Sequence, residues 1–322
     1  MKSFKVSKFQ GWKVEKLKGC HIVLVAIVAV ALAELGARYG LGLGDPPLSI
    51  PDAEIDYLFA PNQDCNRFGN RIVYNNLSMR CDFDVDENCK TSRVYVVGDS
   101  VINGGVLTDH AALATTVLQR DLPNVQVCNV SAGSWGPGNY AAYFRRHPGL
   151  RGGTLIVEVN SHDLWEDDPK ESKGRCVGKD VAFPDHKPWC ALWDGFNRYF
   201  IPRIRGWMGL QQINAKVDVP KWGQDANESA ARWNLSELDW LFGEPFDRKV
   251  LLIHRTRQET QDADRISAGE ARFRQWAREK GIACHLLKLD AELDYRDTIH
   301  LNENGQRKLH QLLRMLRGDE ER

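Results

Sequence analysis

Two short clusters of reactive side chains, far apart in the sequence, have the composition of a nucleophilic catalytic site. Ser100 follows Gly98-Asp99 directly after an apolar run, in a turn that can expose its hydroxyl group. Asp297 and His300 stand three residues apart, just before the last amphipathic segment. At this spacing the carboxylate can hold the imidazole Nδ1–H, which leaves Nε2 to take a proton from a serine. The two clusters together predict a triad of Ser100, His300 and Asp297.

The same residues could also have purely structural roles. Asp297, or the nearby Asn302, could simply cap the following helix, and Gly-Asp-Ser also occurs in ordinary turns. A further feature favours the catalytic interpretation, because Gly133 ends another apolar run and its backbone N–H could point at the same spot as that of Ser100. Two such N–H groups would bind the oxyanion of an acyl-transfer reaction.

Regular elements that could position these residues begin at Arg93. Continuous apolar strands that alternate with amphipathic helices are typical of a parallel sheet covered on both faces, which gives an α/β fold. In such sheets the chemistry collects at the carboxyl ends of the strands, where Ser100 and Gly133 lie. The pattern predicts strands at 93–97, 125–130, 154–159, 249–254 and 283–289, and helices at 110–120, 139–146, 268–280 and 301–316.

Three segments of the sequence resemble motifs, or blocks, of the SGNH (GDSL-type) hydrolase superfamily. The blocks are Val94-Tyr95-Val96-Val97-Gly98-Asp99-Ser100, Asn129-Val130-Ser131-Ala132-Gly133 and Asp297-Thr298-Ile299-His300. The resemblance covers about residues 93–316, apart from one insertion. It implies a flavodoxin-like three-layer α/β/α fold, with Ser100 as nucleophile, His300 as general base and Asp297 as its orienting partner. It also implies oxyanion binding by the N–H groups of Ser100 and Gly133, and no cofactor.

The block after the third strand departs from the family pattern. Members usually have Gly-x-Asn-Asp there, and the asparagine amide completes the oxyanion hole, whereas this chain has Asn160-Ser161-His162-Asp163. Alignment of the aspartates puts His162 in the place of the asparagine, and a neutral imidazole N–H can donate. Asn160 lies two residues earlier, on the same side of a strand, and could supply the amide instead. Both residues are therefore candidates for the oxyanion hole.

The segment before the first strand, from Tyr57 to Arg80, resembles the region that precedes the catalytic domain in membrane-anchored bacterial members of this superfamily. Several relatives add or remove O-acyl groups on envelope polysaccharides, which implies an ester, such as an O-acylated glycan, as substrate. We expect a serine esterase that acts through an acyl-enzyme. One alternative is an O-acyltransferase, in which a sugar hydroxyl replaces water as acceptor. Another is a catalytically silent glycan-binding protein.

The N-terminal 44 residues have the pattern of a targeting signal. Residues 1–18 hold six lysines and one acid, and the apolar run 22–33 follows. Low charge continues to Gly44, and Glu34 and Arg38 can pair on a helix. This favours an uncleaved transmembrane helix over 19–44; a signal cleaved after Ala31-Leu32-Ala33 and a buried core helix are alternatives. Because positively charged flanks stay in the cytoplasm, the uncleaved helix predicts a single-pass protein of the bacterial inner membrane with its catalytic domain in the periplasm. A cleaved signal predicts instead a secreted or periplasmic protein.

The predicted organisation has four parts. They are a basic cytoplasmic tail (1–18), the anchor (19–44), a lead-in with one or two short strands (45–92) and the catalytic domain (93–318), which carries an insertion at 164–245. Seven of the ten tryptophans fall in the insertion. They either form a small core of their own or present flat faces to a sugar or an acyl chain.

Composition limits the partners and cofactors. The chain has 43 Lys+Arg and 43 Asp+Glu, and the residues after 18 carry 37 basic and 42 acidic side chains, so a nucleic-acid partner is not expected. No CxxC or CxxH spacing occurs, so no metal site is expected. Cys176 and Cys190 bracket a loop and are the best disulfide candidates, and a second group of cysteines crowds the lead-in: Cys65, Cys81 and Cys89.

Overall fold

The computed structural model describes residues 19–166, 168–172, 176–208 and 227–317. Its strands are β1 (Ser49–Asp52), β2 (Asp56–Phe59), β3 (Gln63–Arg67), β4 (Asn70–Tyr74), β5 (Arg93–Gly98), β6 (Gln126–Ser131), β7 (Thr154–Asn160), β8 (Arg248–His254) and β9 (Ala283–Leu286). Its α-helices are α1 (Gly19–Leu35), α2 (Ser100–Asn103), α3 (Ala114–Asp121), α4 (Pro137–Arg146), α5 (Pro169–Ser172), α6 (Ala191–Gly195), α7 (Ile201–Trp207), α8 (Glu228–Gly243), α9 (Arg257–Gln261), α10 (Ala268–Lys280) and α11 (Glu303–Leu316). Four short helical segments complete the set: η1 (Gly36–Gly40), η2 (His110–Ala112), η3 (Asp163–Trp165) and η4 (Phe196–Phe200).

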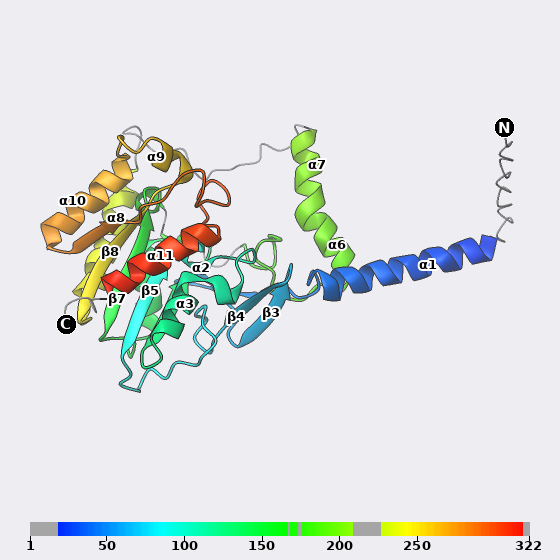
Figure 1. Cartoon of the computed structure of the whole chain (residues 1–322), viewed down its shortest axis with the longest axis horizontal. Helices are drawn as coiled ribbons and strands as arrows, with labels where there is room; N and C mark the ends of the chain where they lie inside the picture. The colour runs from blue at the N-terminus through cyan, green and yellow to red at the C-terminus, as the bar shows by residue number, and fades with distance from the viewer. Residues whose placement is uncertain (1–18, 167, 173–175, 209–226, 318–322) are drawn as a thin grey trace, which may run out of the picture.

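The central sheet has five parallel strands in the order β6-β5-β7-β8-β9 (Figure 1). Val96 in β5 pairs with Asn129 on one side and with Ile156 on the other. In chain order this arrangement is 2-1-3-4-5, which is the doubly wound order with a switch point between the first and third strands. The five strands predicted from the apolar runs are all present, and only β9 is clearly shorter than expected.

Helices cover both faces of this sheet. One core contains Tyr140 from α4, Leu238 from α8 and Phe273 from α10, and the other contains Leu118 from α3 and Leu309 from α11. Alternate residues of β5 enter the two cores, with 95 and 97 in the first and 94 and 96 in the second. The predicted three-layer α/β/α architecture is therefore confirmed.

The lead-in forms two antiparallel pairs, β1–β2 and β3–β4, which is more strand than the pattern predicted. It is fastened to α4 and the turn before it. The Trp135 indole N–H donates to the carbonyl of Tyr57 at 3.2 Å, and the Tyr143 hydroxyl donates to the carbonyl of Leu77 at 2.7 Å. Ile55 and Met79 are fully buried in the first core. The lead-in thus packs as an integral part of the sheet domain.

The last part of the predicted insertion is a core helix. α8 packs on α4, and Gly138 is required at their contact because a Cβ there would lie 1.8 Å from the ring of Trp233. Leu238 and Leu241 of α8 are fully buried in the first core. The helical alternation therefore resumes at Glu228, so the interruption is shorter than the sequence pattern indicated.

The N-terminal helix stands apart from the sheet (Figure 1). Residues His21–Gly40 form a helical stretch long and apolar enough to cross a bilayer, and only 6% of it is buried in the protein. A buried core helix, one of the alternatives for this segment, is therefore wrong. The basic tail predicted at 1–18 lies outside the described residues.

The cysteine prediction is not supported. The seven cysteines that the structure describes are free thiols, so Cys176 and Cys190 do not form the expected disulfide. Cys176 is exposed in a turn, whereas the Cys190 thiol donates to the Glu34 carboxylate at 3.4 Å. Cys190 is thus engaged with the end of α1 and not with the loop that the two cysteines bracket. Cys128, in β6, is a buried thiol.

Candidate active site

Ser100 lies at the carboxyl end of β5, where the strand turns directly into α2. Gly98 is required at this turn because a Cβ there would lie 2.4 Å from Cγ1 of Ile102. The Asp99 carboxylate accepts the backbone N–H of Val101 at 2.6 Å and so caps the helix. As the first residue of α2, Ser100 has a backbone N–H with no acceptor inside the helix. The turn therefore presents both a hydroxyl group and a free helix-terminal donor.

Asp297 and His300 lie in a short closed loop before α11. An antiparallel bridge joins Tyr295 to Leu301 across the loop, and the Arg296 N–H donates to the His300 carbonyl at 2.8 Å. The capping role that was the alternative for Asp297 is taken by another residue, because the Asn302 side chain accepts the first N–H groups of α11. The loop thus leaves the side chains of Asp297 and His300 available to each other.

These three side chains form a continuous chain of hydrogen bonds. His300 Nε2 lies 2.9 Å from Ser100 Oγ, and His300 Nδ1 lies 2.9 Å from Oδ2 of Asp297. A carboxylate can only accept, so Nδ1 carries the proton and Nε2 accepts from the serine hydroxyl. Partial burial raises the pKa of Asp297, but hydrogen bonds from the ring and backbone of His300 outweigh it and hold the pKa well below its usual range. Asp297 is therefore ionised at neutral pH.

Gly133 lies in the turn after β6, the neighbour of β5 in the sheet. The Asn103 amide at the end of α2 donates to the carbonyl of Ser131 at 2.9 Å, which ties the Ser100 helix to the end of β6. The Tyr57 hydroxyl of the lead-in donates to the carbonyl of Gly133 at 2.7 Å. Two elements outside β6 therefore fix this turn at the edge of the sheet where Ser100 lies.

The two side chains of the divergent block have different environments. Asn160 is fully buried at the end of β7, and its amide N–H groups donate to Asp99 at 3.0 Å and Glu158 at 3.3 Å. His162 is partly exposed, with Nε2 3.4 Å from Oδ1 of Asp163. No hydrogen-bond partner for His162 Nδ1 lies within the described chain. Asn160 therefore serves an internal network, whereas His162 has donor capacity left.

Beneath the site, three carboxyl groups are buried together. Burial raises the pKa of Asp99 to about 6, with a further rise from the charge of Asp163. Burial also raises the pKa of Asp163 to about 7 and that of Glu158 well above its usual value. His254, at the end of β8, donates from Nδ1 to the side-chain amide oxygen of Asn160 at 3.2 Å. Burial, followed by the charges of His300 and His162, lowers its pKa to about 3, so the imidazole is neutral.

Sequence reasoning missed this network. The sequence nevertheless contained a feature that indicates the network: Glu158 interrupts the apolar run of β7, and His254 ends the apolar run of β8. A carboxyl and an imidazole in neighbouring parallel strands, each near the carboxyl end, indicate a polar cluster beneath the site.

One set of described residues has the spacing for a cation. Ligand atoms of Asp99, His162 and Asp163 lie within 4.8 Å of one another. The two carboxyl groups are poorly suited to this role, because metal binding requires them to be deprotonated and burial raises the pKa of both. Both also already accept hydrogen bonds, Asp99 from Val101 and Asp163 from the backbone of Asn160.

The raised pKa of Asp163 predicts a pH-dependent stability. The folded protein holds this proton up to about pH 7, whereas the unfolded carboxyl ionises near 3.8. Between these values the folded state binds more protons, so the free energy of unfolding falls as pH rises, by up to about 1.4 kcal/mol per pH unit from this group. Asp163→Asn, which keeps an acceptor for the Asn160 N–H, should lose less stability than wild type between pH 4.5 and pH 7.5, as measured by urea unfolding in detergent. The exposed Asp262→Asn is the control, and identical pH dependence in wild type and Asp163→Asn would contradict the assignment.

Comparison with known proteins gives similarity at the level of structure. No family model and no curated protein matches the chain. Similar solved structures include a member of the lipolytic protein G-D-S-L family from Veillonella parvula, at 9% identity over 70% of this chain and 98% of that chain, with a TM-score of 0.42. Another is an acetylxylan esterase from Geobacillus stearothermophilus, at 11% identity over 73% of this chain and 98% of that chain, with a TM-score of 0.40. A third is LAE5, an alpha/beta hydrolase enzyme from the metagenome of Lake Arreo, Spain, at 13% identity over 72% and 98%, with a TM-score of 0.41. The function is therefore argued below from the geometry of the site.

Proposed function

We propose that this chain is a serine ester hydrolase of the SGNH type. The observation that carries the proposal is the hydrogen-bonded chain in which Ser100 Oγ lies 2.9 Å from His300 Nε2 and His300 Nδ1 lies 2.9 Å from Asp297. This arrangement lets the imidazole accept the serine proton while the ionised carboxylate holds the ring and stabilises the imidazolium.

The reaction follows from these positions in two half-reactions. Ser100 Oγ attacks the ester carbonyl carbon as its proton passes to His300 Nε2, and the carbonyl oxygen becomes an oxyanion. Collapse breaks the bond to the alcohol oxygen, which takes the proton from His300, and the acyl group remains on Ser100. Water then gives a proton to His300 and attacks the acyl carbon, and collapse returns the proton to Ser100 as the carboxylic acid leaves.

Three donors would bind the oxyanion: the N–H groups of Ser100 and Gly133 and the imidazole of His162. We assign the third role to His162 and not to Asn160, because the amide hydrogens of Asn160 already serve Asp99 and Glu158. His162 Nδ1 has no hydrogen-bond partner in the described chain, and Nε2 lies 3.4 Å from Oδ1 of Asp163, so the imidazole is not committed to an internal network as the Asn160 amide is.

His162→Ala should lower kcat for a small aryl acetate by about 100-fold, because it removes one oxyanion donor without touching the triad. His162→Asn should retain more activity than His162→Ala, because it restores an amide donor. Asn160→Ala should instead lower the free energy of unfolding, since it removes the hydrogen bonds that the Asn160 amide donates to the buried carboxyl groups of Asp99 and Glu158. The measurements are steady-state kinetics and urea unfolding of each variant. Mild and equal losses of kcat in His162→Ala and Asn160→Ala would show that neither side chain binds the oxyanion.

The proposed substrate is an acyl ester, in the first place an O-acetyl group on an exported cell-envelope glycan. We propose that α1 stays attached and crosses the bacterial inner membrane, which would put the sheet domain on the periplasmic side beside such glycans. In support, α1 runs unbroken through the Ala31-Leu32-Ala33 segment, and its exposed side chains over residues 22–33 are all apolar. A catalytic domain beside the bilayer suits a substrate that is made or modified at the membrane surface.

The experiment that tests the hydrolase assignment compares two acceptors. Purified full-length protein is incubated with 4-nitrophenyl acetate, with and without a neutral oligosaccharide, and free acetate and acetylated sugar are measured by mass spectrometry. We expect free acetate at the same rate in both mixtures. Acetylated sugar that forms only when the oligosaccharide is present, with no free acetate in its absence, would show an acyltransferase instead.

A further inference from the structure

An exposed apolar surface runs along α6, η4 and α7. Exposed large apolar side chains recur there at intervals of three to four residues, as expected for one side of a helix. The exposed fraction reaches 61% for Phe200 and 89% for Trp207. We call this surface the aromatic face, and it consists of Trp189, Leu192, Trp193, Phe196, Phe200, Ile204, Trp207 and Met208.

The opposite side of these helices is fixed to the protein. Arg67 of β3 is almost completely buried and donates to the Asp194 carboxylate at 3.2 Å and to the Tyr199 hydroxyl at 3.0 Å. On the aromatic face, the rings of Trp193 and Phe196 stack with centroids 5.9 Å apart. The helices therefore cannot turn to bury their apolar side chains without breaking the buried Arg67 contacts.

The same helices are joined to the end of α1. The Glu34 carboxylate accepts the backbone N–H groups of Ala191 and Leu192 at 2.8 and 2.9 Å. Arg38, paired with Glu34, donates to the carbonyls of Pro188 and Trp189 at 3.2 and 2.8 Å. The carboxyl end of α1 is thus hydrogen-bonded to the first residues of α6 and to the residues just before it.

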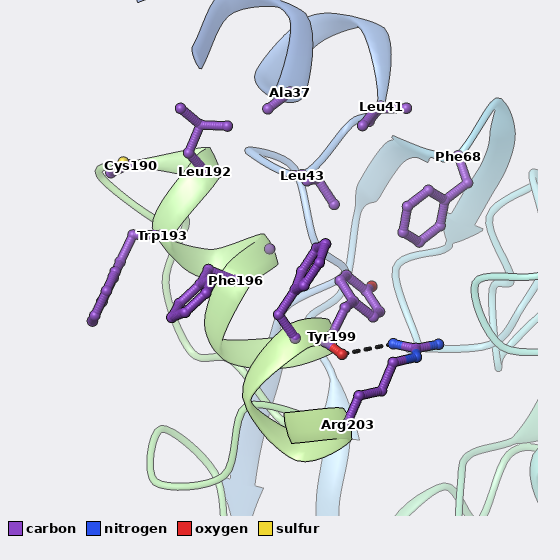
Figure 2. Close-up of a pocket in the computed structure, with 12 residues that line it drawn as sticks. Ala37, Leu41, Leu43, Phe68, Cys190, Leu192, Trp193, Phe196, Tyr199 and Arg203 are labelled. Atoms are coloured by element: carbon purple, nitrogen blue, oxygen red, sulfur yellow. Dashed lines mark hydrogen bonds between the residues drawn. The ribbon is translucent and has the colours of Figure 1, made fainter. Parts of the chain in front are cut away.

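The two parts meet at an apolar corner. α6 and α7 run crosswise to α1 at its carboxyl end (Figure 1). Between them is a cavity of about 910 Å³, lined by Leu41, Leu43 and Phe68 on one side and by Tyr199 of η4 on the other (Figure 2). If α1 crosses a bilayer, a crosswise helix at its end lies along the bilayer surface.

The charges around the aromatic face are basic. Arg203 and Arg205 are exposed. Arg203 donates to the carbonyl of Tyr199 at 2.7 Å, and neither arginine has a carboxylate partner in the described part of the chain. Asp194, the acid on these helices, is already paired with Arg67 and Arg198. An apolar helix face rich in tryptophan and bordered by arginines without carboxylate partners has the composition of helices that lie in a membrane interface and contact anionic headgroups.

We propose that the α6–α7 segment is a second membrane-binding element that lies flat in the bilayer interface, with the aromatic face among the acyl chains and Arg203 and Arg205 at the lipid phosphates. Acyl chains fill the corner between α1 and α6. This inference depends on the proposal that α1 crosses the membrane. A single helix tethers a domain without orienting it, whereas two joined crosswise elements hold the sheet domain at a fixed height and tilt.

Fluorescence quenching by brominated lipids tests this proposal. Full-length protein is reconstituted in vesicles of phosphatidylcholine and phosphatidylglycerol whose acyl chains carry bromine near the headgroup, and in unbrominated vesicles. The lipid-dependent quenching of tryptophan fluorescence should be largely lost in the Trp189→Phe, Trp193→Phe, Trp207→Phe triple variant, which removes every tryptophan of the aromatic face, and retained in Trp240→Phe. Ile204→Asp should lower the quenching by roughly half or more, because a charge at this depth is costly. Ile266 is a comparably exposed isoleucine outside the aromatic face, 52% exposed against 40% for Ile204, and Ile266→Asp should leave the quenching unchanged.

Equal quenching in wild type and the triple tryptophan variant would overturn the proposal, as would equal quenching in Ile204→Asp and Ile266→Asp. A dimer with the aromatic face cross-linked to a second copy and no quenching would assign the face to self-association instead. Flotation of the vesicles shows whether α1 holds the protein on lipid, and a chain that does not float overturns both proposals. Hydrolysis of 4-nitrophenyl acetate by the same samples is a separate readout, because lost quenching with retained hydrolysis refutes the membrane face alone.

Discussion

Ser100→Ala is expected to lower kcat/KM for 4-nitrophenyl acetate by about 10⁴-fold or more, while the protein stays folded. The substitution removes the oxygen that forms the acyl-enzyme and keeps the rest of the turn. The Asp99 cap on Val101 and the backbone N–H of residue 100 do not depend on the hydroxyl group. The residual rate would come from oxyanion binding alone, which still helps water to attack.

Ser236→Ala is a suitable control for this measurement, because Ser236 is an exposed serine of α8 whose hydroxyl donates to the carbonyl of Trp233. It should hydrolyse the ester at the wild-type rate. If folded Ser100→Ala retained more than about a tenth of the activity, Ser100 would not be the nucleophile, since loss of the attacking atom lowers the rate by far more than tenfold.

His300→Gln is expected to lower kcat/KM by a similar factor of about 10⁴. Glutamine can keep a hydrogen bond to Ser100, but it cannot take the serine proton and return it to the leaving alcohol. Because both residues act in one step, the Ser100→Ala, His300→Gln double variant should be no slower than either single variant. Steady-state kinetics of the three variants, with circular dichroism as a check of folding, measures this.

The exposed His285→Gln is the matched control for that series and should leave the rate unchanged. A double variant that loses the product of the two single effects would mean that Ser100 and His300 act independently. That result would contradict a shared proton transfer across the 2.9 Å contact between Ser100 Oγ and His300 Nε2.

Much of the fold and the triad followed from sequence patterns, for physical reasons. Buried parallel strands are apolar throughout, so β5, β7 and β8 could be recognised as runs without polar alternation. Ser100 and His300 are separated by 200 positions, yet their places after a central strand and before the last helix predicted that they would meet. Local spacing also predicted the Asp297 to His300 contact, because it spans only three residues.

These sequence patterns could not predict long-range packing. Arg67 has the sequence context of an exposed strand residue, and only the arrival of α6 and η4 from more than 120 positions away makes it buried and paired. The pairing of Cys176 with Cys190 was predicted from their positions around a loop, and it was wrong because Glu34 holds Cys190. Asn160 was a candidate oxyanion donor by strand alternation, but its amide donates to Glu158 in the same strand and to Asp99, which long-range packing brings beside it from 61 positions away.

The proposed membrane face and the proposed catalytic site depend on different parts of the chain. The residues of the proposed triad come from the turn after β5 and the loop before α11, whereas the aromatic face is formed by α6, η4, α7 and the residues that flank them. Substitutions in one should therefore leave the other intact, which lets the orientation of the domain at the membrane be varied without changing its chemistry.

Covalent labelling of Ser100 tests the central claim most directly. A fluorophosphonate reacts with a serine only where a base activates the hydroxyl group, and it leaves a stable phosphonate on that oxygen. Peptide mass spectrometry of labelled wild-type protein should find the phosphonate on Ser100, and labelling should be absent in Ser100→Ala and strongly reduced in His300→Gln. Equal labelling of wild type and Ser100→Ala, or a label on a different serine, would contradict the assignment of Ser100 as the nucleophile.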